Sequence, residues 1–283
     1  MRSSTIFKNE EIDSIAIGGF DGIHIGHQAL ISKLTSNGLL IIVDKGNASL
    51  TPSIHRCKYL DKKCLFLPLE DIKHLTASEF IDFIKSRFIN LKKIVVGYDF
   101  KFGKYRKGNA YTLKEYCLVD VDIVDEVIIE GVSVHSRTIK NLIKDDKIEQ
   151  ANRLLGRHYC LFGTVIKGQG LGKKELFATL NLDVKEFLIP SNGVYASFSK
   201  IGDKRYPSVT FIGNRVSVDN QFSIETHILD KNIEEIVDNV EICFVQHIRK
   251  NMKFDTLHDL KNQIALDIKQ AKEILQKFYK SKK

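Results

Sequence analysis

Residues 18–27 form the stretch that decides the fold, and they read Gly18-Gly19-Phe20-Asp21-Gly22-Ile23-His24-Ile25-Gly26-His27. An apolar run, Ser14 to Ile17, precedes this stretch, and a helix-like pattern, His27 to Leu34, follows it. In open α/β sheets, ligands bind at the carboxyl ends of the strands, where such loops lie. Glycines let the backbone approach a ligand closely, a new helix offers N–H groups to an anion, and His24 and His27 are spaced to share one phosphate. The stretch therefore predicts a phosphate-binding loop, with two incidental histidines in a glycine-rich turn as the alternative.

Outward from this loop, short apolar segments and helix-like stretches alternate between Ile12 and Val124. The segments are Ser14 to Ile17, His27 to Leu34, Leu39 to Val43, Ala77 to Phe88, Lys93 to Gly97 and Val119 to Val124. Such alternation indicates parallel strands joined by crossover helices. Thr76 and Glu79 have the spacing of a capping box for the helix that follows them. The sequence therefore predicts an N-terminal α/β domain of Rossmann-like type.

The pattern changes after a helix-like stretch, Asn141 to Leu155, that ends at a capping residue, Gly156. Short β-like runs separated by turn residues follow: Cys160 to Ile166, Gly193 to Phe198, Ser208 to Ile212, Phe222 to Leu229 and Val240 to Ile248. The last stretch, Thr256 to Tyr279, repeats apolar residues at spacings of three and four. We therefore expect a C-terminal antiparallel β-barrel with a terminal α-helix, and domains at residues 1–156 and 157–283.

Composition excludes several classes of protein. The chain has 283 residues, 43% of them hydrophobic, so it is globular and long enough for two domains at roughly 100 to 200 residues each. Its apolar runs are far shorter than the roughly 20 residues of a membrane-spanning helix. The formal charge is +8, from 43 basic and 35 acidic residues, which fits phosphate ligands but does not separate nucleotides from nucleic acids.

The cysteines and the N-terminus bear on location in the cell. Five cysteines form no CxxC pair, which predicts reduced residues rather than a disulfide framework or a zinc site: Cys57, Cys64, Cys117, Cys160 and Cys243. The first residues lack the apolar core of a secretory signal. We therefore expect a cytoplasmic protein.

The loop at residues 18–27 resembles the GxFDGxHxGH signature of the HxGH nucleotidyltransferases, and within them the FAD synthetase module of bacterial bifunctional riboflavin kinase/FAD synthetases. All seven specified positions of the signature are present. The resemblance implies adenylyl transfer from ATP to FMN, with His24 and His27 as catalytic residues that neutralise charge on the transferring phosphate. It implies that the other residues contacting ATP phosphates are Gly19, Phe20, Asp21, Gly22 and Gly26.

Two more N-terminal segments are similar to this family. Residues 97–103 resemble its GxDFxFG loop, which implies flavin contacts from Asp99, Phe100, Phe102 and Gly103. Without the family, the two phenylalanines are ordinary strand residues. Residues 136–140 match an STxIR-like stretch that grips the triphosphate, which implies phosphate contacts from Ser136, Arg137 and Lys140, although Arg137 stands where the family has threonine. The family's TFxPHP-like segment has no counterpart at residues 42–47.

The C-terminal half carries a glycine-rich segment in which Gly168, Gly170, Gly172 and Lys173 are candidates for phosphate binding. The spacing is neither that of a Walker loop nor GxGxxG, so a plain hairpin turn is the alternative.

Residues 177–182 resemble the FPTANL motif of riboflavin kinases. That resemblance implies Mg²⁺ and ATP contacts from Thr179 and Asn181, a general base in Glu225, and a flavin contact from Arg249. Without the neighbouring motifs, Glu225 is interpreted as a strand residue that faces the surface. For His227 we expect a structural hydrogen bond rather than a catalytic role.

Together the resemblances imply a bifunctional enzyme that phosphorylates riboflavin to FMN and adenylylates FMN to FAD, with ATP and Mg²⁺ in both steps. Its expected partners are small-molecule substrates, with no nucleic acid and no membrane. One alternative is mainly a riboflavin kinase with a weak adenylyltransferase site. Another is a basic nucleic-acid-binding protein, although the barrel segment lacks interleaved basic and aromatic residues. The sequence leaves the oligomeric state open.

Overall fold

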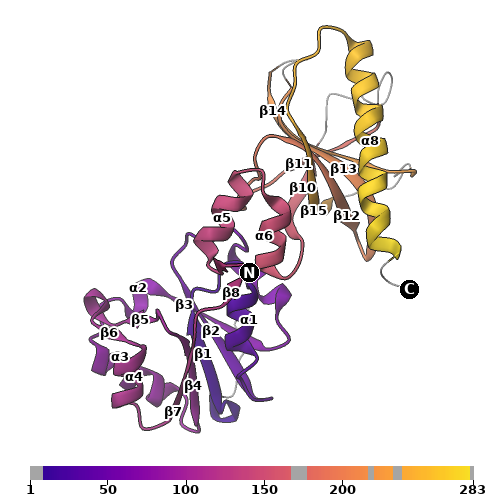
Figure 1. The fold of residues 1–283 in the computed structure, drawn as a ribbon. Helices are drawn as coiled ribbons and strands as arrows, with labels where there is room; N and C mark the ends of the chain where they lie inside the picture. The colour runs from indigo at the N-terminus through magenta and orange to yellow at the C-terminus, as the bar shows by residue number, and fades with distance from the viewer. Residues whose placement is uncertain (1–8, 167–176, 216–219, 232–237, 281–283) are drawn as a thin grey trace. The chain divides into compact units, whose positions relative to one another are not determined.

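The computed structural model describes residues 9–166, 177–215, 220–231 and 238–280 (Figure 1). The chain divides into two compact units, Met1–Ser136 and Arg137–Lys283. None of the helices within the described ranges is long and apolar enough to cross a membrane.

Unit 1 is built on a parallel sheet of five strands in the order β3-β2-β1-β4-β7. The strands are β1 (Ser14–Gly18), β2 (Gly38–Asp44), β3 (Lys63–Pro68), β4 (Lys93–Gly97) and β7 (Asp120–Val124). The predicted parallel sheet is confirmed, and the strand order reverses at β1, between β2 and β4. Strand β3 was not predicted from the sequence.

Helices and short hairpins connect these strands. The helices are α1 (Ile25–Ile31), α2 (Leu69–Ile72), α3 (Ala77–Arg87) and α4 (Ala110–Tyr116), with 3₁₀ turns η1 (Asn9–Glu11), η2 (Ser53–Tyr59) and η3 (Lys104–Arg106). The hairpins pair β5 (Lys101–Phe102) with β6 (Gly108–Asn109), and β8 (Ile128–Ile129) with β9 (Val132–Ser133). The predicted capping box of α3 is confirmed, since Thr76 and Glu79 bond each other's backbone N–H.

The sheet of unit 1 is buried on both faces. Alternate residues of each central strand join different apolar clusters, so that Ile15 and Ile17 pack on one side and Ala16 on the other. This explains why the strands read as continuous apolar runs, as strands of parallel sheets do. The carboxyl ends of the strands are thereby left as the edge on which polar loops can gather.

Unit 2 contains a closed antiparallel barrel of six strands in the order β10-β11-β14-β13-β12-β15. The strands are β10 (Tyr159–Ile166), β11 (Leu180–Asp183), β12 (Gly193–Ile201), β13 (Lys204–Asn214), β14 (Phe222–Ile228) and β15 (Asn239–Lys250). The long helix α8 (Leu257–Lys280), yellow in Figure 1, packs Ala271, Ile274 and Leu275 against outward-facing apolar residues of the barrel. The predicted barrel and terminal helix are confirmed.

The helix predicted over Asn141 to Leu155 is instead two helices, α5 (Ser136–Lys144) and α6 (Ile148–Leu155). Between them Asp146 has φ of 61°, a left-handed backbone that no continuous helix contains. The predicted cap is confirmed, since α6 ends at Gly156 with φ of 71°. Residues 137–156 belong to unit 2 by their contacts, whereas the domains expected from the sequence divide at residue 156.

The barrel interior contains a cluster of hydroxyl groups. Its members are fully buried and bonded to one another: Ser197, Ser199, Ser208, Thr210 and Thr226. Thr210 bonds Ser197 at 2.7 Å and Thr226 at 3.0 Å, both between hydroxyl oxygens. Since each hydroxyl has partners, these side chains replace an apolar core without an unsatisfied polar group.

The prediction that all five cysteines are reduced is wrong for four of them. Cys57 is bonded to Cys64, and Cys160 to Cys243. The second pair is separated by 83 residues, and only the register of β10 against β15 brings it together. Strand register cannot be read from cysteine spacing.

We predict that Asp267→Ala destabilises unit 2 by about 3–5 kcal/mol, because it removes one partner of a buried ion pair. Arg249 of β15 donates from Nε and Nη2 to the two carboxylate oxygens of Asp267 on α8, at 2.8 and 2.7 Å. Asp267 is only 3% exposed. Denaturant unfolding followed by circular dichroism measures the loss. Asp255→Ala, at an exposed position, is the matched control, and an equal effect of both variants contradicts the prediction.

Candidate functional site

The loop between β1 and α1 presents two stacked histidine rings. His24 caps α1, with its Nδ1 accepting a hydrogen bond from the backbone N–H of His27 at 3.2 Å. The ring centroids of His24 and His27 lie 3.6 Å apart with an interplanar angle of 16°. Because Nδ1 of His24 is the acceptor, the proton of the neutral ring lies on Nε2. The site therefore has an imidazole N–H donor whose orientation is fixed by the helix cap.

Backbone geometry in this loop is unusual. Phe20 has φ of 51° and Ile23 has φ of 40°, although both are buried residues with a side chain. Such conformations each cost of the order of 1–3 kcal/mol and cluster at functional sites. At Gly26, an added Cβ would lie 3.2 Å from the His24 ring and 3.3 Å from the Val134 carbonyl oxygen. A side chain at this position would therefore press on the His24 ring, which must shift by a few tenths of an ångström to make room.

Asp21 fixes this loop to the segment that follows β2. Its carboxylate accepts backbone N–H groups from Ser49, Leu50 and Thr51 at 3.2, 2.9 and 3.0 Å. In return, the Thr51 hydroxyl accepts the N–H of Gly22 at 2.7 Å. The Asp21 carboxylate thus serves the loop's shape, and its predicted phosphate contact stays a prediction.

Two further polar side chains bond the loop backbone. The Ser136 hydroxyl donates to the carbonyl oxygen of Asp21 at 2.7 Å. Arg56, 1% exposed, donates to the carbonyl oxygens of Gly19 and Ser53 at 3.1 and 3.2 Å and to the Asp44 carboxylate at 3.0 Å. The predicted role of Ser136 at the triphosphate is untested. Gly19 is exposed beside these contacts.

The end of β4 contributes a second polar group at the same edge of the sheet. The Tyr98 hydroxyl bonds Glu126 at 3.1 Å and His135 at 3.3 Å, and the Ser133 hydroxyl also donates to Glu126. Desolvation and the Glu126 hydrogen bond raise the pKa of Tyr98. Hydrogen bonds from Ser133 and Tyr98 lower the pKa of Glu126. These four side chains form a polar cluster beside the predicted flavin loop.

The predicted flavin residues have different surroundings. Asp99 is exposed, whereas Phe102 is 6% exposed and packs on Phe80 with ring centroids 5.1 Å apart. Phe100 lies 5.6 Å from Phe102 and packs against the same core. Gly103 has φ of 71°, and an added Cβ would lie 2.9 Å from the backbone nitrogen of Ala77. Their contact with flavin stays a prediction, and so do the phosphate contacts of Arg137 and Lys140, which lie on α5 in unit 2.

Unit 2 brings the predicted kinase residues together on the outer face of the barrel. Asn181 on β11 lies directly opposite Glu225 on β14, so their side chains share one face. The Thr179 hydroxyl is 3.5 Å from Oε2 of Glu225. Arg215 pairs with Oε1 at 3.6 Å between nitrogen and oxygen. Among the described residues, Oε1 is buried and has no hydrogen-bond partner.

The other residues predicted in unit 2 fall into three groups. Nδ1 of His227 lies 2.7 Å from the Ala178 carbonyl oxygen, so the expected structural hydrogen bond is confirmed. Arg249, predicted to bind flavin, is engaged by Asp267, and its flavin contact is untested. The glycine-rich candidates Gly168, Gly170, Gly172 and Lys173 lie outside the described residues.

Comparison with known proteins now shows the family of the chain. A family model described as FAD synthetase matches residues 6–40 and 46–138, and one described as riboflavin kinase matches residues 155–275. A bifunctional riboflavin kinase/FMN adenylyltransferase from Listeria monocytogenes is 31% identical over 284 residues, covering 89% of this chain and 89% of that protein. The chain belongs to the bifunctional riboflavin kinase/FMN adenylyltransferase family.

Other members of the family and one solved structure extend the likeness. The relative from Buchnera aphidicola is 29% identical, with 94% of each chain covered. A crystal structure described as a macrolide-efflux protein from Streptococcus pneumoniae is 26% identical, with a TM-score of 0.83 over 92% of this chain and 94% of that chain. The family resemblance expected from the sequence is confirmed along nearly the whole chain.

Within this bifunctional family framework, sequence reasoning missed Thr51, Arg56 and the polar cluster at Tyr98. Arg56 stands next to His55 and near Lys58 in a stretch with mixed polarity, and no pattern around it signals burial. Thr51 is 29 residues from Gly22, so their contact depends on the fold. One signal was present: Asp44, which ends β2 and pairs with Arg56, stands in the segment where the family motif was expected and not found.

We predict that Arg56→Gln lowers the free energy of unfolding by about 2–3 kcal/mol at neutral pH, through loss of its charged hydrogen bonds. Burial raises the pKa of Asp44, but hydrogen bonds from Arg56 and the Gly46 N–H outweigh it, so the net pKa lies below 3.8. The stabilisation from this pair is therefore fully present above pH 3.8 and is lost as the pH falls through the folded-state pKa.

Urea unfolding of both proteins at neutral pH and well below pH 3.8 measures this dependence. The difference between them is expected to shrink in acid. Arg87→Gln, an exposed position on α3, is the control for a change of net charge. If the difference in the free energy of unfolding between the two proteins does not change with pH, the ion pair with Asp44 is not the source of the stabilisation by Arg56.

Proposed function

We propose that unit 2 phosphorylates riboflavin to FMN and that unit 1 adenylylates FMN to FAD, each step using ATP. Membership of the bifunctional family supports both activities. The observation that carries the proposal is the position of Glu225, whose buried Oε1 shares a barrel face with Thr179 and Asn181. We place the functional boundary of the two domains at residues 156 and 157, close to residue 155, where the match to the riboflavin kinase model begins.

Glu225 acts as the general base of the kinase step. Its Oε1 accepts the proton of the terminal ribityl hydroxyl while the hydroxyl oxygen attacks the γ-phosphorus of ATP. The bond between the γ-phosphorus and the β–γ bridging oxygen breaks, and ADP leaves. Arg215, paired with the same carboxylate, keeps Glu225 oriented on its strand. No covalent intermediate is needed, since the two substrates react directly.

Thr179 and Asn181 fit a magnesium site. A hydroxyl, an amide oxygen and the nearby Glu225 carboxylate are all oxygen donors, the type that Mg²⁺ prefers. When bound there, the ion supplies charge neutralisation for the ATP phosphates. Thr179 and Asn181 would hold the ion, and Glu225 beside them would face the flavin hydroxyl.

The adenylyl step uses the stacked histidines of unit 1. The phosphate of FMN attacks the α-phosphorus of ATP, and pyrophosphate leaves. The Nε2–H of His24, fixed by the cap, and the ring of His27 stabilise the charge that develops on the transferring phosphate. Positioning and charge stabilisation supply most of the catalysis in such reactions.

We expect the enzyme in the cytoplasm, where the ATP that both steps consume is supplied. Its expected ligands are ATP, riboflavin and FMN, without nucleic acid. A protein that turns riboflavin into FMN but makes no FAD even from added FMN would be mainly a riboflavin kinase. No turnover at all would favour the nucleic-acid-binding alternative, which salt-dependent oligonucleotide binding would reveal.

We predict that Glu225→Gln lowers riboflavin phosphorylation by about 10²–10⁴-fold, since the amide cannot take the hydroxyl proton. FAD formation from added FMN should be unchanged. Chromatography of FMN and FAD over time measures both steps. Glu273→Gln, on the exposed side of α8, is the matched control. Unchanged kinase activity in Glu225→Gln would contradict the assignment of Glu225 as the general base.

We predict that His27→Asn lowers FAD formation from FMN and ATP by about 10²–10³-fold, through loss of one preorganised donor. The helix cap survives, because it uses the backbone N–H of His27 rather than its ring. Riboflavin phosphorylation should be retained. His74→Asn, at an exposed position, is the matched control. Normal FAD formation in His27→Asn would contradict the assignment of the stacked rings to this step.

A further inference from the structure

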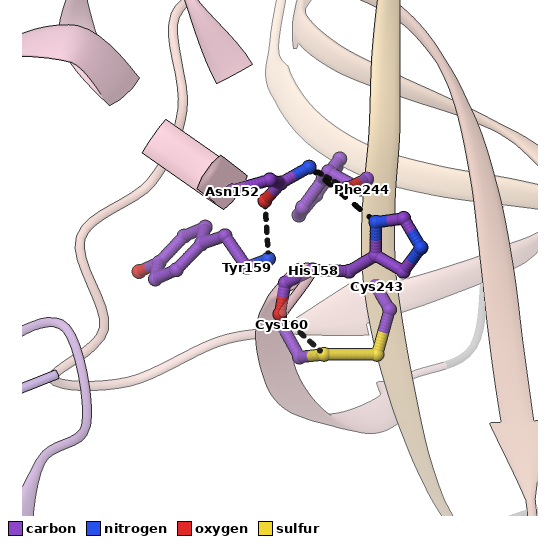
Figure 2. Close-up of a disulfide and its surroundings, with 6 residues drawn as sticks. All are labelled: Asn152, His158, Tyr159, Cys160, Cys243 and Phe244. Carbon is purple, nitrogen blue, oxygen red and sulfur yellow. Dashed lines mark hydrogen bonds between the residues drawn. A yellow bond between two sulfur atoms is a disulfide. The ribbon is translucent and has the colours of Figure 1, made fainter. Parts of the chain in front are cut away.

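A set of metal-ligating side chains lies on the outer face of the barrel, and neither proposed reaction uses it. Cys160 on β10 is bonded to Cys243 on β15, and Glu241 also lies on β15 (Figure 2 shows the disulfide). One ligand atom from each of these three residues lies within 4.8 Å of the other two. Within the described residues, no other group of three His, Cys, Asp or Glu side chains meets this condition.

Strand register produces this set. Cys160 lies directly opposite Cys243, and Phe162 lies directly opposite Glu241. Residues two apart on a strand share a face, so Glu241 and Cys243 point the same way, to the side opposite the buried Val240, Ile242 and Phe244. The three ligand residues therefore converge because of the fold, and their convergence does not depend on a flexible loop.

The backbone around both cysteines is held from one side by Asn152 of α6. Its Oδ1 accepts the N–H of Tyr159 at 2.7 Å, and its Nδ2 donates to the carbonyl oxygen of Phe244 at 2.9 Å (Figure 2). Tyr159 precedes Cys160 and Phe244 follows Cys243, so one side chain ties the two strands next to both sulfurs. These bonds do not involve the sulfur atoms and survive reduction of the disulfide. The frame for a ligand site is thus present in both redox states.

We propose that, once the disulfide is reduced, Cys160, Cys243 and Glu241 bind a borderline-soft divalent cation of the Zn²⁺ class. Two thiolates and one carboxylate are ligands that Zn²⁺ takes, and they leave its fourth tetrahedral position open. Hard cations such as Mg²⁺ prefer oxygen ligands alone, so this site is separate in chemistry from the kinase site. Two sulfurs bound to one tetrahedral Zn²⁺ at about 2.3 Å lie about 3.8 Å from each other. Directly opposed residues on neighbouring strands can bring their sulfurs this close.

The redox step and the binding step balance. A dithiol reductant transfers two electrons and two protons to the Cys160–Cys243 bond, giving two thiols in the protein and a cyclic disulfide of the reductant. Zn²⁺ then binds as the two thiols release their protons. Oxidation to the disulfide removes both sulfur ligands, so binding occurs in the reduced protein only. The inference does not depend on the proposed catalytic functions.

The experiment uses the full chain with Cys57, Cys64 and Cys117 changed to serine, so that only Cys160 and Cys243 remain. This protein is reduced with a phosphine, freed of reductant, and titrated with Cd²⁺, a soft probe of the same ligand set. The expected result is one equivalent of Cd²⁺ with an ultraviolet thiolate-to-metal absorption band. Protein loaded first with Zn²⁺ should show no such band, and the band should appear as Cd²⁺ is added and displaces Zn²⁺ from the thiolates.

Variants and the oxidised protein separate this site from adventitious binding. Adding Cys160→Ser or Cys243→Ser should abolish the band, and leaving the disulfide oxidised should do so without any mutation. Adding Glu241→Gln should weaken binding by about tenfold or more, since even the loss of a partner outside the ligand set costs about 10–100-fold. Glu149→Gln, on α6, is the matched control.

The absence of a band in the reduced protein overturns the proposal, and so does a band that persists in the oxidised protein. Cd²⁺ binding that is unaffected by Glu241→Gln would contradict the proposal that Glu241 is a ligand. Far-ultraviolet circular dichroism of each variant checks that it is folded.

Discussion

Three backbone N–H groups converge on the Asp21 carboxylate, and the shape of the loop proposed to bind nucleotide in unit 1 depends on this interaction. It holds the loop after β1 to the segment after β2, although 28 to 30 residues separate the partners. The unfavourable backbone angles of Phe20 and Ile23 persist because these bonds over-determine the loop. With the loop fixed, His24 caps α1, and its ring is held against that of His27.

The two units solve the same problem, in-line reaction at a phosphorus of ATP, with different scaffolds. Unit 1 gathers its polar groups at the carboxyl edge of a parallel sheet, next to the point where the strand order reverses at β1. Unit 2 uses one outer face of a closed barrel, where cross-strand register sets Asn181 opposite Glu225. In both, the side chains proposed for catalysis lie on or beside regular elements whose positions are fixed by backbone hydrogen bonds.

Sequence patterns predicted the parallel sheet, the barrel, the terminal helix and both motif-bearing segments, because hydrophobic periodicity and turn residues are local properties. They did not predict β3 or the break at Asp146 between α5 and α6. Arg56 and the Cys160–Cys243 pair also escaped prediction. Burial and strand register arise from contacts across the fold, and neither leaves a mark in the neighbouring residues.

The hydroxyl cluster inside the barrel has a thermal consequence. Exposing apolar surface on unfolding raises the heat capacity, whereas exposing polar surface lowers it. Ser197, Ser199, Ser208, Thr210 and Thr226 place polar atoms where a barrel of this size ordinarily buries hydrocarbon. Unit 2 therefore unfolds with a smaller heat-capacity change than an apolar barrel of the same length. Its free energy of unfolding therefore varies less steeply with temperature. This broadens the temperature range over which the barrel face that carries Asn181 and Glu225 stays folded.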